Sequence, residues 1–269
     1  MAESVIATPG GKFFLKEKIM SYFPPHECYI EIFGGAAHVL LAKPKLQIEI
    51  YNDLDRSLYC FFKMVREKNE EFFYKIETTP YSREMFNELK TIKPETEVDI
   101  AWRFYAINRM SFGAKRTGQT FGYGIVRRPA FYRIEKFYPL IKRLQDVTIE
   151  NLDFREIISK YDGEDCFFYN DPPYDGSENM YSNVYMFSKK DHIDLAELLR
   201  GIKGKFLLSQ ADTDFIRELY KDFYMIEITR YNAISLTKDA DRSTSKELLI
   251  ANYNLFYYET PLFFKGGET

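Results

Sequence analysis

The segment from residue 29 to residue 53 constrains the fold more than any other part of the chain. Its apolar run at 29–33 predicts a short strand, Gly34 and Gly35 interrupt that strand, 36–42 predicts a helix, and 48–51 predicts a second strand. This order of elements normally places the two strands parallel, and parallel strands occur in sheets whose faces are covered by helices. We therefore expect an α/β protein.

The rest of the chain extends this sheet and interrupts it once. A helical pattern covers 14–23, strand patterns return at 147–149, 166–169, 206–209, 225–230 and 248–253, and amphipathic helices are predicted at 189–200 and 213–220. Only a polar loop separates the last two strands, which predicts an antiparallel pair at a sheet edge. The prediction is a Rossmann-like mixed sheet with an antiparallel C-terminal hairpin, formed by residues 1–56 and 144–269, and a mainly helical domain inserted at 57–143.

Charge is distributed unevenly between these two parts. The 269 residues include 37 Lys and Arg and 40 Asp and Glu, for a net charge of −3. The segment 101–143 holds ten Lys and Arg residues and one acidic residue, so it carries +9 while the remainder carries −12. The insertion is therefore expected to bind a polyanion such as a nucleic acid, and which residues read bases or contact phosphates stays open. The candidate contacts are Arg109, Lys115, Arg116, Arg127 and Arg128.

Several common classes of protein lack their signatures here. The three cysteines form no C-x-x-C pair, the histidines have no metal-ligand spacing, and neither G-x-S-x-G nor G-x-x-x-x-G-K-[ST] occurs. These observations argue against zinc hydrolases, serine hydrolases and P-loop nucleotide triphosphatases. No apolar run predicts a membrane span and the N-terminus lacks a signal-peptide layout, so we expect a cytoplasmic protein without a bound metal.

A tetrapeptide after a predicted strand carries the most specific chemical signal. The strand at 166–169 leads into Asp171-Pro172-Pro173-Tyr174, at the sheet edge where open α/β proteins bind ligands. Two consecutive prolines fix the backbone and remove two N–H donors, which leaves carbonyl oxygens that only accept. A carboxylate, a fixed carbonyl and an aromatic ring suit an amino group on a flat ring, because they offer two acceptors and a face for stacking. A β-turn with a packed tyrosine is the alternative.

The turn after the first strand indicates a second binding feature. Glycines at 34 and 35 let the backbone approach a ligand closely, and Asp53, at the end of the next strand, is placed to bind ribose hydroxyls. The dinucleotide pattern G-x-G-x-x-G is missing, and Glu31, Asp53 and Asp171 would repel a dinucleotide phosphate but suit a cationic sulfonium. A close helix–strand crossing that needs small residues is the simpler explanation of the glycines.

The order of these motifs resembles the Dam-like adenine-N6 DNA methyltransferases of the D12 class (alpha-group), whose recognition domain lies between cofactor motif and catalytic motif. The resemblance rests on Thr8-Pro9-Gly10-Gly11-Lys12, residues 31–35, Asn52-Asp53, the basic insertion and residues 171–174. It covers nearly the whole chain. It implies the S-adenosylmethionine-dependent methyltransferase fold and methyl transfer to adenine N6 in duplex DNA, with S-adenosylhomocysteine as product. Ala37 departs from the family pattern, which has a glycine there.

The resemblance also implies the roles of the site residues. Asp171 and the Pro172 carbonyl would accept the two N6 hydrogens, Pro173 belongs to the same motif, and Tyr174 would stack on a base flipped out of the duplex. Residues 153–154 would contact the cofactor adenine. No metal and no covalent intermediate are needed. The implied cofactor contacts are Gly10, Lys12, Glu31, Phe33, Gly34, Gly35, Asp53, Asp153, Phe154 and Asp171.

Other functions stay open at this point. They are methylation of cytosine N4 or of an RNA base, a non-catalytic nucleic-acid-binding protein of the same fold, and a nicotinamide-dependent dehydrogenase. Aspartate at position 171 favours adenine over cytosine, and the intact motifs argue against a non-catalytic protein. We expect a monomer in solution that binds DNA and no membrane. Open as well are the recognised DNA site, a cellular or phage origin, and a cognate restriction endonuclease that acts separately.

Overall fold

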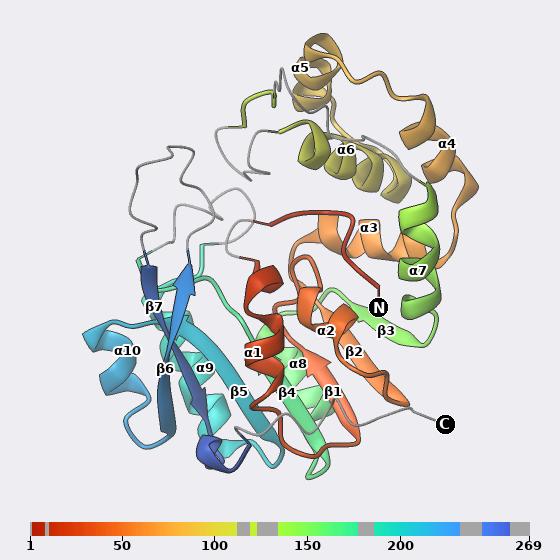
Figure 1. Cartoon of the computed structure of the whole chain (residues 1–269). Helices are drawn as coiled ribbons and strands as arrows, with labels where there is room; N and C mark the ends of the chain where they lie inside the picture. The colour runs from red at the N-terminus through yellow and green to blue at the C-terminus, as the bar shows by residue number, and fades with distance from the viewer. Residues whose placement is uncertain are drawn as a thin grey trace.

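A seven-stranded mixed sheet runs through the molecule, with the strand order β3-β2-β1-β4-β5-β7-β6 (Figure 1). The computed structural model describes residues 2–8, 11–111, 119–122, 134–176, 186–231 and 244–258. The strands are β1 (Cys28–Glu31), β2 (Ile48–Asn52), β3 (Val147–Glu150), β4 (Cys166–Asn170), β5 (Lys205–Ala211), β6 (Tyr224–Tyr231) and β7 (Thr244–Ala251). β3, β2, β1, β4 and β5 are parallel, whereas β7 is antiparallel to both β5 and β6. The predicted mixed sheet with an antiparallel C-terminal pair is confirmed.

The order of the strands reverses between β1 and β4. From β1 the chain moves outward through β2 to β3, then returns to β4 on the other side of β1 and continues to β5. Open α/β sheets bind ligands at such a reversal, beyond the carboxyl ends of the strands. Glu31 is aligned with Tyr169 in this pair, so the segments after β1 and after β4 leave the sheet side by side.

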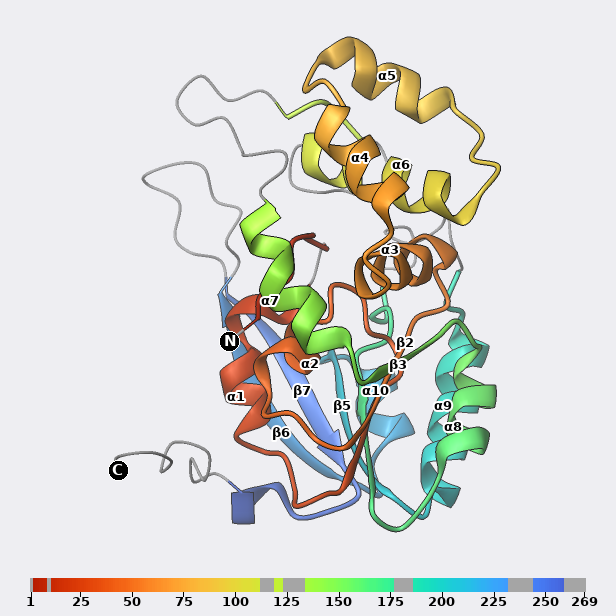
Figure 2. The ribbon, with the colours of Figure 1, turned by 90° about the vertical axis from the view of Figure 1, so that its right-hand side faces the viewer.

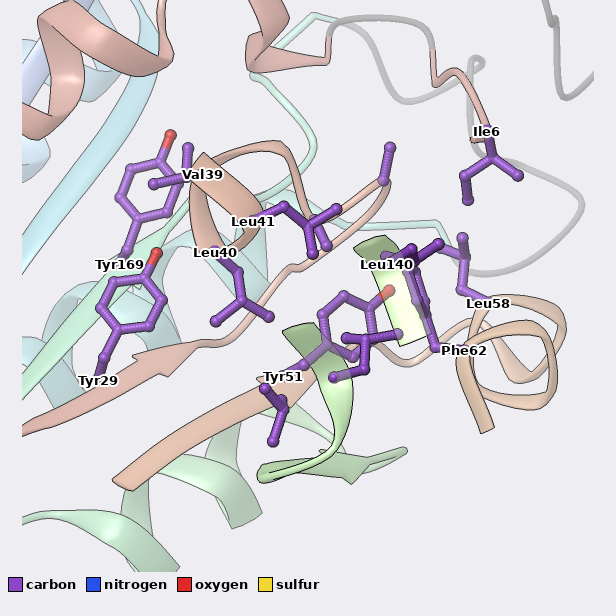
Figure 3. Packing of buried hydrophobic residues seen from close by; sticks show 14 of the residues in the cluster. Ile6, Tyr29, Val39, Leu40, Leu41, Tyr51, Leu58, Phe62, Leu140 and Tyr169 are labelled. Carbon is purple, nitrogen blue, oxygen red and sulfur yellow. The ribbon is translucent and has the colours of Figure 1, made fainter. Parts of the chain in front are cut away.

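Helices cover both faces of the sheet because successive strand residues point to opposite sides. Tyr29 packs with Leu40 and Tyr51 on the face covered by α1 (Lys16–Met20) and α2 (His38–Ala42) (Figure 3). Ile30 belongs to the opposite cluster. That second face is covered by α8 (Phe154–Tyr161), α9 (Lys189–Gly201) and α10 (Asp214–Leu219), and α8 and α9 stand beside the sheet in Figure 2.

Among the residues that the structure describes, five helices lie between β2 and β3. They are α3 (Arg56–Arg66), α4 (Glu70–Thr78), α5 (Arg83–Thr91), α6 (Glu97–Met110) and α7 (Ile134–Leu144). The side chains of Asp55, Asn69, Ser82 and Thr96 each accept a backbone N–H of the first turn, which explains where α3 to α6 begin. α4, α5 and α6 lie away from the sheet (Figures 1 and 2), and α5 and α6 share a small core of their own.

The helical segment also shares the main core. Phe62 of α3 and Leu140 of α7 pack in the same cluster as Tyr29 and Tyr51 of the sheet (Figure 3). The division into residues 57–143 and the remainder therefore stays a prediction. None of the helices in the described part of the chain is both long enough and apolar enough to cross a membrane.

Several element boundaries differ from the predicted ones. α2 begins at His38 rather than residue 36, because Ala37 has a left-handed backbone (φ 57°) that no helix interior accommodates. The predicted helix at 14–23 is shorter, since a 3-10 turn at Lys12–Phe14 precedes α1. β6 and β7 extend further toward each other than expected. The predicted hairpin or loop at 112–124 lies mostly outside the described residues, apart from an antiparallel bridge between Ser111 and Phe121.

Candidate active site

Two donors hold the carboxylate of Asp171, which follows β4. The Lys12 ammonium lies 2.7 Å from Oδ1, and the Ser209 hydroxyl donates to the same oxygen over 2.8 Å. Lys12 is almost fully buried, whereas the Asp171 side chain keeps 20% of its surface exposed. Among the described residues both donors reach Oδ1, which leaves Oδ2 available to accept a hydrogen bond from a ligand.

The same ammonium group contacts the tyrosine of the motif. Lys12 Nζ donates to the Tyr174 hydroxyl over 2.7 Å and lies 4.7 Å from the centre of its ring. The hydroxyl in turn donates to Glu247 Oε2 over 3.0 Å, and that oxygen lies 3.8 Å from Lys12 Nζ. Burial, reinforced by the Asp171 carboxylate, raises the pKa of Tyr174 well above its ordinary value, so its hydroxyl stays a donor.

Sequence reasoning missed Ser209 and Glu247. Both are fully buried, on β5 and β7, and each stands beside a run of apolar residues in its strand. A polar residue that borders an apolar run within a predicted strand was the available signal. The register aligns Glu247 with Ala211, which brings this residue to the carboxyl end of β5.

The loop after Asp171 is fixed by residues that follow it along the sheet edge. Gln210 donates from Nε2 to the Pro173 carbonyl over 3.3 Å and accepts the Asp175 N–H over 3.4 Å. The Thr213 hydroxyl donates to the Asp175 carboxylate over 2.9 Å. The backbone of the motif is thus held by its prolines and by hydrogen bonds from β5 and the start of α10.

The glycine turn after β1 combines two separate requirements. A side chain at Gly34 would bring its Cβ within 2.1 Å of the Tyr51 ring, so close packing alone accounts for this glycine. Gly35 has φ +51°, and its N–H donates to Asp53 Oδ2 over 2.8 Å. The Tyr51 hydroxyl donates to the Gly35 carbonyl over 2.8 Å. The half-buried Asp53 therefore lies beside the turn, as the sequence predicted, and supports it.

Glu31 differs from the expectation that it adds charge to the site. Its carboxyl is buried and accepts the Tyr29 hydroxyl and the Leu40 N–H, each over 2.9 Å. Burial raises the pKa of Glu31 to about 8, so this group is largely protonated at neutral pH. Its observed contacts hold the start of α2, and its predicted contact with a cofactor stays a prediction.

Aromatic side chains gather beside the turn. The ring of Phe33 is half-buried and lies 6.0 Å from that of Phe154 and 5.7 Å from that of Phe187. Asp153 begins α8 by accepting the Arg155 N–H, and its carboxylate pairs with the Arg155 guanidinium at 3.1 Å. The residues predicted after β1, β2, β3 and β4 therefore meet at one edge of the sheet.

One of the five predicted DNA contacts lies in the described part of the chain. Arg109 is half-buried in the last turn of α6. Lys115, Arg116, Arg127 and Arg128 lie outside the described residues, as does Gly10. Some of the positive charge of this segment is internal: the guanidinium of Arg143 pairs with the buried Glu49 and donates to the Leu40 carbonyl. The +9 of the segment therefore overstates its surface charge.

Comparison with known proteins gives these contacts a context. The sequence profile of the D12 class N6 adenine-specific DNA methyltransferases matches residues 9–234, from just before Lys12 to three residues beyond β6. The chain belongs to this family. As an adenine-N6 DNA methyltransferase it has DNA as its substrate, and its mixed sheet is the expected fold of such enzymes. Among the described residues no cluster of three or more His, Cys, Asp or Glu is arranged to hold a metal ion.

Three relatives of this methyltransferase are similar over most of their length. Type II methyltransferase M.CviBI of Paramecium bursaria Chlorella virus NC1A is 26% identical, over 93% of this chain and 99% of that protein. Type II methyltransferase M.MjaIII of Methanocaldococcus jannaschii is 27% identical, over 84% and 88%. The Retron Ec67 DNA adenine methylase of Escherichia coli is 24% identical, over 92% and 91%. Similarity along the whole chain agrees with the family assignment.

Proposed function

We propose that this methyltransferase moves a methyl group from S-adenosylmethionine to N6 of an adenine flipped out of duplex DNA, and that residues 171–174 form the pocket for that base. The observation that carries the proposal is the one-sided support of Asp171, whose Oδ1 receives both Lys12 and Ser209. Oδ2 and the Pro172 carbonyl are then the two acceptors for the N6 hydrogens.

Two acceptors address the main chemical difficulty of the reaction. The N6 lone pair of adenine is delocalised into the ring and is a poor nucleophile. Hydrogen bonds from both N–H groups favour a pyramidal nitrogen and direct its lone pair toward the methyl group. A carboxylate whose oxygens are already oriented provides this alignment without reorganisation during the reaction.

Tyr174 has the properties needed to stack on the flipped base. Its hydroxyl is tied to Lys12 and Glu247, so the ring direction is set before a base enters. A duplex hides the amino group from an in-line methyl donor, and extrusion of the base removes this obstacle. The preset ring offers an aromatic face for that base.

The residues at the sheet edge fit S-adenosylmethionine, which when bound supplies a methyl group activated by a sulfonium. The half-buried ring of Phe33 beside Phe154 suits a flat base, and the Gly34–Gly35 turn lets the backbone approach closely. Asp53 and Asp171 provide negative charge for a cation. The cofactor contacts we propose are Gly10, Lys12, Glu31, Phe33, Gly34, Gly35, Asp53, Asp153, Phe154 and Asp171.

The helical insertion is the proposed DNA-binding part. Its basic residues at 109, 115, 116, 127 and 128 are the proposed contacts with duplex DNA. Two relatives are named type II methyltransferases, which supports methylation of specific sites in association with restriction. The monomeric state, the cytoplasmic location and a separate restriction endonuclease remain predictions.

The test is a direct analysis of the methylated product. Purified protein is incubated with methyl-labelled S-adenosylmethionine and DNA that lacks adenine methylation, and the product is digested to nucleosides. We expect the label in N6-methyldeoxyadenosine and none in RNA offered in parallel. Label in N4-methyldeoxycytidine, or full activity after Asp171→Ala, would contradict the proposal.

A further inference from the structure

Glu247 is a buried carboxylate at the site, and its negative charge has no role in methyl transfer as described above. It is the fourth residue of β7 and 2% exposed, and its Oε2 accepts the Tyr174 hydroxyl and lies 3.8 Å from Lys12 Nζ. We propose that Glu247 sets the net charge around Lys12 so that the site binds the cationic cofactor in preference to its neutral product. This inference rests on the proposed use of S-adenosylmethionine.

Lys12 brings a buried positive charge to the site. Its ammonium is 4% exposed and lies 2.7 Å from the Asp171 carboxylate. These two charges alone sum to zero, and a buried ammonium beside the site would repel a sulfonium. Charges in a poorly solvated site interact strongly because little water screens them. Lys12 therefore weakens the attraction between Asp171 and a cation unless a second anion offsets it.

Glu247 is the second anion. With Lys12 and Asp171 it forms a group of net charge −1, which matches the +1 of a sulfonium. Glu31 lies nearby, but burial raises its pKa to about 8, so it adds little charge at pH 7. Glu247 acts through Lys12 and Tyr174 rather than on the reacting atoms, which makes it a positioning and specificity-determining residue.

The measurement is a ratio of affinities. S-adenosylmethionine carries the sulfonium, whereas S-adenosylhomocysteine is otherwise nearly identical and lacks that charge. Titration calorimetry at pH 7 gives both dissociation constants for each variant of the full chain. A variant with a disturbed fold should bind both ligands more weakly by the same factor. A change in local charge should instead alter the ratio of the two dissociation constants.

Three variants test whether the net charge of Lys12, Asp171 and Glu247 sets the preference for S-adenosylmethionine. Glu247→Gln keeps an acceptor for Tyr174 and removes the charge, and we expect the preference for S-adenosylmethionine to fall about tenfold. Lys12→Met makes the group more negative, and the preference should rise. The double variant Lys12→Met/Glu247→Gln returns the group to −1, so its ratio should return to the wild-type value although catalysis is impaired.

Glu49→Gln is the matched control. Glu49 is as buried as Glu247 and is paired with Lys43 and Arg143. It is the second residue of β2, so it lies near the amino end of its strand, whereas the site lies beyond the carboxyl ends. Its ratio should equal that of the wild type. If Glu247→Gln and Lys12→Met each bind both ligands with the wild-type ratio of affinities, the inference is overturned but the proposed function is not. Should Glu247→Gln not fold, Lys12→Met decides. A wild-type chain that binds neither ligand would overturn the proposed function as well.

Discussion

Lys12 Nζ lies 2.7 Å from Asp171 Oδ1, although one residue precedes β1 and the other follows β4. Lys12 is placed by a 3-10 turn before α1 and Asp171 by a loop that two prolines and Gln210 hold. The contact therefore joins the two motifs of the chain that are expected to meet cofactor and base. Because the donor is buried and the acceptor is half-buried, this pair orients the Asp171 carboxylate.

Asp171→Asn should reduce kcat by about 100-fold or more while leaving the folding of the chain nearly unchanged. The asparagine amide has the same shape but one acceptor oxygen in place of two. That oxygen can serve Lys12 and Ser209 or the substrate amino group, but not all of them. Steady-state kinetics with DNA and thermal unfolding measure these effects. Asp175→Asn, four residues later in the same loop, is the control and should keep most of the activity. Equal losses in both variants would argue for a general disturbance of the loop.

Glu31→Gln should change the pH dependence of stability. The pKa of Glu31 is about 8 in the folded chain and near 4.5 otherwise, so the folded state holds a proton that the unfolded state releases between these values. Stability of the wild type therefore falls relative to the variant as pH rises from 5 to 8, by up to about 1.4 kcal/mol for each pH unit. Urea unfolding at pH 5, 6.5 and 8 measures the difference.

Glu49→Gln provides the contrast for this experiment. Burial opposes the ionised form of Glu49, but Arg143 and Lys43 outweigh it and lower the pKa of this carboxyl. Its contribution is lost only as pH falls below the ordinary carboxyl range, so the difference from wild type should be constant between pH 5 and 8. A parallel slope in both variants would mean that Glu31 is ionised in the folded chain.

Ala37→Gly should stabilise the fold by about 0.5–1 kcal/mol. Ala37 has φ 57°, a backbone conformation that is unfavourable for alanine and nearly neutral for glycine. The turn before α2 requires this conformation. Ala36→Gly, at a neighbouring buried position without a positive φ, should destabilise by a similar amount. The urea midpoint of each variant is compared with that of the wild type. If both midpoints shifted in the same direction, this explanation would be contradicted.

Arg109 and Arg143 should separate DNA binding from stability within one basic segment. Arg109→Ala should weaken binding to duplex DNA and reduce the slope of log affinity against log salt by about one. Arg143→Gln should leave that slope unchanged and cost about 3 kcal/mol of stability, because it leaves the buried Glu49 with Lys43 alone. Fluorescence anisotropy at several salt concentrations and urea unfolding provide the two readouts.

The seven strands, their alternation with helices and the two site motifs were predictable from the sequence because they depend on local patterns. The apolar run at 29–33 predicts a buried strand wherever it lies, and Asp171-Pro172-Pro173-Tyr174 restricts its own backbone. The helices that begin at Asp55, Asn69, Ser82 and Thr96 also depend on a local contact, but their starts were not predicted. Local rules failed at Ala37, where the turn imposes a backbone that alanine alone would not indicate.

Tertiary structure alone decided what the charged residues do. The sequence marks Glu31, Glu247, Lys12 and Arg143 as charged. In the structure Glu31 is largely neutral at pH 7, Lys12 and Glu247 face each other at the site, and Arg143 pairs with Glu49. The effect of a charge depends on its burial and on partners that arrive from distant parts of the chain. No local pattern contains that information, because the strand order that brings β1, β4, β5 and β7 together is set by packing of the whole sheet.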